Sequence, residues 1–204
     1  MLMKIQWKPY MIDPNTEKGG EEYTAYNRRR WGSDGWTHHL RSEGRGVGAN
    51  FANWKWWPHT MKAHQMVCFF EERDGVQDNN DDDQGEDITS RCNQALFQAL
   101  YEEGQNLSNI DTLVNSVAVA KLGLSSNDTN TLRQYLQQDQ AASRVKREIA
   151  QAQQQYRISG VPFFIIGYQN PEQQEQSTPY GFSGAQSPET FLEIFRELSE
   201  GADD

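Results

Sequence analysis

The segment Gly160-Val161-Pro162 runs directly into four large apolar residues, Phe163 to Ile166. An apolar run of this length after a turn predicts a short buried strand. Proline donates no hydrogen bond to a sheet ladder, so it is confined to the first residue of a strand, an edge or a bulge. The trans form of an X-Pro bond is favoured by only about 0.5–1 kcal/mol, so a cis bond is accessible here. We therefore expect Pro162 to open a strand, with a cis bond to Val161.

The composition limits the compartment and the kinds of partner. The chain has 204 residues, suited to one domain, and a net charge of −10. This acidic balance argues against nucleic acid and anionic membranes, which both favour basic patches. No apolar run reaches the roughly 18 residues of a membrane-spanning helix, and no secretory leader is expected. Cys68 and Cys92 are far apart, which argues against a disulfide framework. The sequence predicts a cytoplasmic protein.

Residues 74–87 form an acidic segment, DGVQDNNDDDQGED. Such a segment buries too little apolar surface to offset its ordering entropy, so we expect a disordered loop. Its alternating Asp and Asn residues resemble the ligands of a calcium loop. However, Asp83 stands where that loop needs Gly, and Thr89 where it needs Glu. No metal site is expected here or elsewhere in the chain.

The N-terminal residues alternate between apolar and polar side chains. Ile5 and Trp7, followed by Tyr10, give the pattern of a half-buried strand over residues 3–10. Asp13-Pro14 then provides a stop signal. The sequence predicts that the chain begins with a strand.

Apolar side chains recur at helical spacing through the middle of the chain. Pro58 is expected at the first position of one helix, where a missing N–H is tolerated. Ser90 is expected to cap another helix, and Asp139 to mark an irregularity within a third. The predicted helices cover residues 21–31, 58–70, 90–100, 110–118 and 132–156.

The end of the chain predicts two strands and a helix. Residues 169–178 form a polar insertion within a hairpin. Ser187 and Pro188 have the residue types of an N-cap and of the first residue of a terminal helix. The residues expected to face inward from that helix are Phe191, Leu192, Phe195 and Leu198.

These segments resemble a known family. Gly160-Val161-Pro162 and the later Ser183-Gly184-Ala185-Gln186 resemble the C-terminal half of DsbA-like thioredoxin-fold oxidoreductases of the FrnE type. Residues 5–14 resemble the second strand of that family. Pro58-His59-Thr60 and Ala63-His64 resemble its Pro-Asn-Thr and Ala-His pair, with His59 in place of Asn. The resemblance covers residues 5–198.

The resemblance implies an α/β, thioredoxin-like fold in a single domain over residues 1–204. It implies a large helical insertion at about residues 20–155 and a β-β-α end at about residues 158–200. The first strand of the family, its Cys-x-x-Cys and its first helix have no counterpart here. Three explanations stay open: a truncated member, a redox-silent binding protein that completes its sheet as a homodimer, and a relative of glutathione-dependent isomerases.

The resemblance also implies where a ligand would bind. Val161 and Pro162 would present backbone groups to a cysteinyl peptide or a glutathione-like thiol, and residues Ser183, Gly184, Ala185 and Gln186 would meet a carboxylate of glutathione. His64 is included as a residue of the cleft, with a packed helix histidine as the alternative. No cofactor is expected apart from glutathione as a ligand. No catalytic residue is assigned, because a free Cys in an apolar helix usually behaves as a small hydrophobe. Whether the chain is an enzyme is left open.

Overall fold

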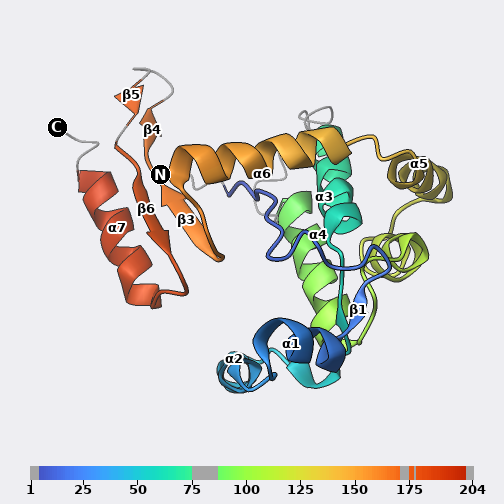
Figure 1. The fold of residues 1–204 in the computed structure, drawn as a ribbon. Helices are drawn as coiled ribbons and strands as arrows, with labels where there is room; N and C mark the ends of the chain where they lie inside the picture. The colour runs from blue at the N-terminus through green and yellow to red at the C-terminus, as the bar shows by residue number, and fades with distance from the viewer. Residues whose placement is uncertain (1–4, 75–86, 171–174, 177, 201–204) are drawn as a thin grey trace. The chain divides into compact units, whose positions relative to one another are not determined.

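The computed structural model describes residues 5–74, 87–170, 175–176 and 178–200. The chain divides into two compact units (Figure 1). The helical unit comprises residues 7–148, and the β-β-α unit comprises residues 1–6 and 149–204. Within the described ranges, no helix is long and apolar enough to cross a bilayer.

The helical unit is built almost entirely from helices. A small sheet pairs β1 with β2 in an antiparallel manner, with Glu21 opposite Trp57. Its described elements are β1 (Glu21–Glu22), α1 (Tyr23–Trp31), α2 (Trp36–Gly46), η1 (Phe51–Asn53), β2 (Trp56–Trp57), α3 (Met61–Asp74), α4 (Ile88–Phe97), η2 (Gln98–Glu102), η3 (Thr112–Val119), α5 (Ser126–Gln137) and the first part of α6 (Ala142–Tyr156).

The core of this unit lies where α3 packs against α4 and α5, and where η3 packs against α4 and α5. The fully buried apolar side chains of these elements include Met66, Leu113, Val114, Val117, Leu132 and Leu136, and Val145 of α6 is also fully buried. They recur at the helical spacing seen in the sequence, which confirms helices in the regions predicted from that spacing. Residues 112–119 wind as a π-helix rather than an α-helix.

The break between α5 and α6 falls at the predicted irregularity. Asp139 has a φ of +55°, in the left-handed region that ends an α-helix. Its carboxylate accepts hydrogen bonds of 2.8 Å from both Lys62 and Gln65 of α3. The turn is therefore fastened to a neighbouring helix.

The cap of α4 was predicted one turn too late. Asp87, not Ser90, is the N-cap, and its side chain accepts from the N–H groups of Thr89 and Ser90 at 2.9 and 3.0 Å. Ser90 lies inside the helix and donates its hydroxyl to Asp87 at 2.6 Å. Both N–H groups bond to the same carboxylate oxygen, Oδ1, while Oδ2 accepts the Ser90 hydroxyl. One carboxylate therefore satisfies two of the free N–H groups of the first turn. Residues 75–86, which include most of the predicted acidic loop, lie outside the described residues.

Pro58 does not begin a helix. It follows β2, and α3 starts at Met61. The carbonyl of Thr60 accepts from the N–H of His64 at 2.9 Å, so the first helical hydrogen bond starts two residues after the proline. Residues 58–60 connect the end of β2 to the start of α3.

The predicted N-terminal strand is also wrong for the residues described. Residues 5–10 have no strand geometry, and Trp7 is 41% exposed. The indole N–H of Trp7 donates to Ser90 Oγ at 2.8 Å. The carbonyl of Tyr10 lies 3.1 Å from Nε2 of His64, in α3. These bonds to helical side chains take the place of ladder bonds to a neighbouring strand.

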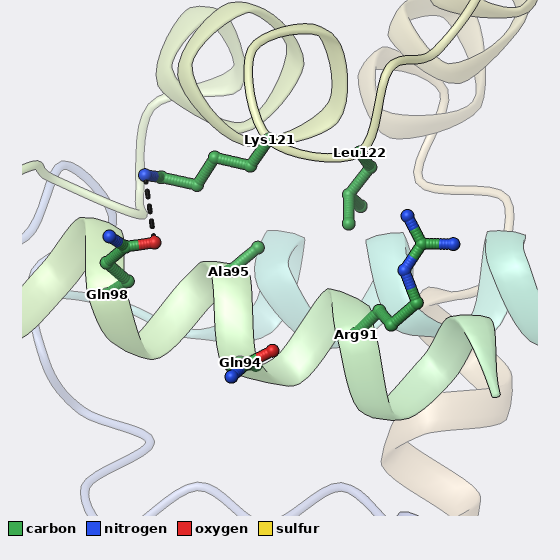
Figure 2. Close-up of a pocket in the computed structure, with 6 residues that line it drawn as sticks. All are labelled: Arg91, Gln94, Ala95, Gln98, Lys121 and Leu122. Carbon is green, nitrogen blue, oxygen red and sulfur yellow. Dashed lines mark hydrogen bonds between the residues drawn. The ribbon is translucent and has the colours of Figure 1, made fainter. Parts of the chain in front are cut away.

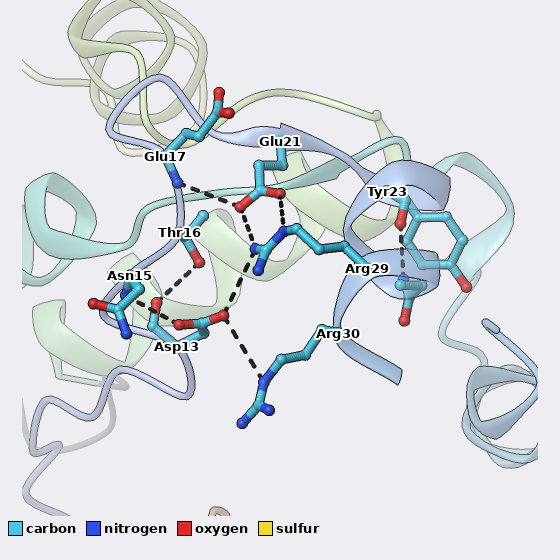
Figure 3. Close-up of polar contacts among 9 residues, drawn as sticks. Asp13, Asn15, Thr16, Glu17, Glu21, Tyr23, Arg29 and Arg30 are labelled. Atoms are coloured by element: carbon cyan, nitrogen blue, oxygen red, sulfur yellow. Dashed lines mark hydrogen bonds and ion pairs between the residues drawn. The ribbon is translucent and has the colours of Figure 1, made fainter. Parts of the chain in front are cut away.

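The run Arg28-Arg29-Arg30 lies on an exposed face of α1, and two of its members are paired. Arg29 donates to both carboxylate oxygens of Glu21 at 2.7 and 3.0 Å, and it lies 3.8 Å from Asp13 (Figure 3). Arg30 lies 3.9 Å from the same aspartate. The run therefore fastens residues 13–21 to α1.

The described part of the β-β-α unit contains the end of α6, two small hairpins and the helix α7 (Pro188–Glu200). β3 (Phe163–Ile166) pairs with β6 (Tyr180–Ser183) in an antiparallel manner, with Phe163 opposite Ser183. β4 (Gln169–Asn170) pairs in the same manner with β5 (Glu175–Gln176). The helix α7 closes the unit. This confirms the predicted strands and the start of the helix at Pro188.

One face of the β3–β6 hairpin packs against α7. Phe164 and Phe182 lie 5.3 Å apart by ring centroid, and Phe191 of α7 lies 5.0 and 5.6 Å from them. Ile194 and Leu198 are buried, but Leu192 is 52% exposed. The prediction that Leu192 faces inward is wrong, because the packed stripe of α7 runs through residues 191, 194, 195 and 198.

Candidate functional site

The two segments singled out in the sequence lie together in the β-β-α unit. The Val161–Pro162 peptide bond is cis. The carbonyl of Pro162 accepts a hydrogen bond of 2.8 Å from the N–H of Gly184, one step beyond the pair formed by Phe163 and Ser183. Gly184 has a φ of +85°, a conformation that residues with a Cβ rarely adopt. The glycine therefore allows the chain to turn while it remains bonded to Pro162.

Val161 and Pro162 are both exposed in this arrangement. Val161 is 43% exposed, and its backbone N–H and C=O have no hydrogen-bond partner in the part of the unit that the structure describes. The groups lie at the entrance of β3, where an extended ligand would continue the ladder. We call Val161, Pro162 and Gly184 the Val161 platform.

The segment after Gly184 is accessible and leads into the N-terminus of α7. Ser183, Ala185 and Gln186 are exposed, and the Gln186 carboxamide donates to the carbonyl of Ser183 at 3.3 Å. A hydrogen bond from Ser187 lowers the pKa of the Glu189 carboxyl. The first turn of α7 thus already carries a carboxylate, which would compete with the carboxylate of a ligand for the free N–H groups.

His64 belongs to the helical unit and takes part in a different set of contacts. Its Nε2 lies 3.1 Å from the carbonyl of Tyr10, so this nitrogen donates and carries the proton. Burial lowers the pKa of His64 to about 4, although the bond to Tyr10 acts in the opposite direction. The ring is neutral near pH 7, and its one N–H is already used. This is the geometry of a packed helix histidine.

Neither cysteine has the surroundings of a reactive thiolate. Cys68 is 4% exposed, and burial raises the pKa of its thiol to about 11. Cys92 is fully buried, and burial raises its pKa to about 12. The helix dipole favours a thiolate only in the first turn of a helix. Because α4 begins at Ile88, Cys92 lies beyond that turn. Both residues behave as small members of the core.

No group of His, Cys, Asp and Glu side chains within residues 5–74, 87–170, 175–176 and 178–200 is arranged to hold a metal ion. The Val161 platform and the segment that follows Gly184 offer backbone groups and exposed polar side chains, among them Ser183 and Gln186.

The comparisons with known proteins give one family. The model of the DSBA-like thioredoxin domain matches residues 3–196. A search of the curated proteins finds no match. The mixed α/β architecture, with small sheets and many helices, fits a thioredoxin-like fold with a helical insertion. Since the match covers nearly the whole chain, the protein belongs to the family of DSBA-like thioredoxin domains.

Proposed function

We propose that this chain binds cysteinyl peptides or glutathione-like thiols at the Val161 platform and carries out no thiol–disulfide exchange with its own cysteines. The observation that carries the proposal is the open N–H and C=O of Val161 beside the Pro162–Gly184 hydrogen bond. An extended thiol ligand can add to these groups as a short strand. The family supports a thiol–disulfide setting for such a ligand.

The lack of exchange chemistry follows from the cysteines. Exchange needs a thiolate that reaches a disulfide sulfur, and the rate depends on both thiolate fraction and access. Cys68 and Cys92 are buried with raised pKa values. The chain as it stands is expected to give no insulin reduction above the uncatalysed rate.

Ligand binding is tested by thermal unfolding with and without S-hexylglutathione, which has the thiol blocked and cannot take part in exchange. A ligand that binds only the folded protein raises the melting temperature. The rise is expected to disappear in Pro162→Ala and to persist in Pro188→Ala, which changes another proline of the same unit. A rise that survives Pro162→Ala, or no rise in the unchanged protein, would contradict the proposal.

Within the family, we place the chain with the FrnE-type proteins. The support is the order of the patterns, from Ile5 through Ala63-His64 to the Gly184 segment. A cytoplasmic location belongs to the same proposal and agrees with the reduced state of both cysteines. Expression with a fluorescent tag tests the location, and a diffuse cytoplasmic signal is expected.

A further inference from the structure

We propose that the helical unit contains a second binding site, for a small aliphatic carboxylate, which is independent of the Val161 platform. The site is a groove of about 200 Å³ between α4 and the segment that follows η3 (Figure 2). The residues that line it are Arg91, Gln94, Ala95, Gln98, Lys121 and Leu122.

Among the residues that the structure describes, the groove contains one positive charge without an ion pair. Lys121 is neutralised, because its Nζ lies 2.5 Å from Glu103 and donates to Gln98 Oε1 at 3.2 Å. The guanidinium of Arg91 is exposed and has no hydrogen bond or ion pair with any residue that the structure describes. One free charge in an acidic chain matches a monoanion better than a phosphate. A guanidinium also binds both oxygens of a carboxylate at once.

The remaining lining residues define the rest of the ligand. The oxygen of the Gln98 carboxamide is used by Lys121, which leaves its NH₂ group as a donor. Gln94 adds a second carboxamide on the same helix. Ala95 on α4 and Leu122 on the opposite segment lie between the two cations and add apolar surface to the groove (Figure 2). A carboxylate with a short aliphatic stem fits this combination.

The π-helical winding around the groove also supports a binding site there. Gln98 is the first residue of the π-helical η2, and Lys121 and Leu122 follow the π-helical η3. The N–H groups of Lys121 and Leu122 both donate to the carbonyl of Val117, at 3.1 and 3.2 Å. π-helical segments are rare and occur frequently at functional sites. Here the groove is built from the start of one such segment and the end of the other.

The test is a titration of the ¹⁵N-labelled protein with sodium butyrate, followed by ¹H–¹⁵N NMR. Saturating shifts are expected at the side-chain amides of Gln94 and Gln98 and at the backbone of residues 121–122. The Kd is expected on the order of millimolar for so small a ligand. n-Butanol, which has the stem without the charge, should give no saturating shifts. Inorganic phosphate should bind more weakly than butyrate. Shifts that do not saturate, or tighter binding of phosphate, would overturn the proposal.

Variants separate this site from non-specific attraction of anions. Arg91→Gln removes the free charge, and Gln94→Glu places a repelling carboxylate in the groove. Both are exposed positions, so the fold should be kept, and the unchanged NMR signals elsewhere verify it. Each variant is expected to weaken butyrate binding about tenfold. Arg45→Gln, which removes an exposed arginine of α2, is the matched control and should bind as the unchanged protein does. Equal losses in Arg91→Gln and Arg45→Gln would refute a specific site.

Discussion

The guanidinium of Arg144, in α6, donates to the carboxylate of Glu72, in α3, at 3.2 Å. The same guanidinium bonds to Glu71 and, at 2.8 Å, to Glu148. One cation therefore joins two helices whose residues are more than seventy positions apart in the sequence. The Arg144 side chain is 26% exposed, so solvent screens these pairs only in part.

Removing this cation should loosen the contact between α3 and α6. Arg144→Gln is expected to lower the free energy of unfolding by about 1–2 kcal/mol, because three carboxylates lose their shared partner. Urea denaturation followed by circular dichroism measures the effect. Arg147→Gln, an exposed position of the same helix, is the control and should change stability by less than about 0.5 kcal/mol. Equal effects of the two variants would show that the network contributes nothing.

Gly20 should not tolerate a side chain. Its φ is +79°, and an added Cβ would lie 2.8 Å from both Asn106 Oδ1 and Ser108 Oγ. Gly20→Ala is expected to destabilise the protein by roughly 1–3 kcal/mol through backbone strain and overlap. Gly19→Ala, where nothing lies within 4 Å of the new carbon, is the neighbouring control and should be nearly neutral. The urea midpoints of the two variants are compared, and a destabilised Gly19→Ala would argue against this explanation.

The cap of α4 should make stability depend on acidity. Burial tends to raise the pKa of Asp87, but hydrogen bonds from Ser90 and Thr89 outweigh it, so the pKa lies below its ordinary value of 3.8. A depressed folded pKa means that the cap stabilises the fold fully above the unfolded pKa. That contribution is lost as the pH falls through the folded pKa, so stability should drop below about pH 4.

Two variants isolate this contribution. Asp87→Ala is expected to lose about 1 kcal/mol near pH 7, because α4 loses its N-cap. Asp87→Asn keeps a capping oxygen that does not titrate, so it should retain most of the stability and show a shallower loss between pH 5 and pH 3. Unfolding free energies of the three proteins, measured across this range, show whether Asp87 causes the loss of stability in acid. An acid dependence in Asp87→Asn as steep as that of the unchanged protein would assign the effect to other carboxylates.

The two thiols should resist modification in the folded protein. Cys68 and Cys92 are buried and have raised pKa values, so the reactive thiolate is scarce and shielded. Ellman's reagent at pH 7.5 is expected to react slowly with the native protein and to count both cysteines at once in denaturant. Rapid modification of either thiol in the native state would reopen a redox role for it.

Some features of the fold could be predicted because the conformational preferences of single residues determine them. The left-handed turn at Asp139 and the start of α7 at Pro188 both depend on residues whose preferences are visible in a single sequence. The position of Pro162 at the entrance of β3 was predicted in the same way, since a proline in a sheet has few places to lie. The role of Val161 as a ligand-facing residue was implied by the family resemblance and stays a prediction. The bond between Pro162 and Gly184 joins segments that the resemblance had already paired.

Other features depend on neighbours that a sequence does not display. Asp87 became the cap in preference to Ser90, although both residue types cap helices well. The inward stripe of α7 passes through Ile194 and leaves Leu192 exposed, and helical spacing alone allows either choice. The π-helical winding of residues 112–119 was missed, because its buried residues are spaced as in an α-helix. The groove beside Arg91 depends on that winding and so had no signal in the sequence.

The bond between Pro162 and Gly184 has a consequence for selectivity. The carbonyl of Pro162 already accepts from Gly184, and a proline has no N–H, so the residue of the platform that could both donate to and accept from a ligand main chain at the entrance of β3 is Val161. Its peptide groups are the same as those of other residues, so the platform would recognise the extended course of a main chain and remain indifferent to the side chains beside the sulfur. Any preference for particular side chains in the proposed ligand would therefore have to be supplied by surfaces outside the three residues that form the platform.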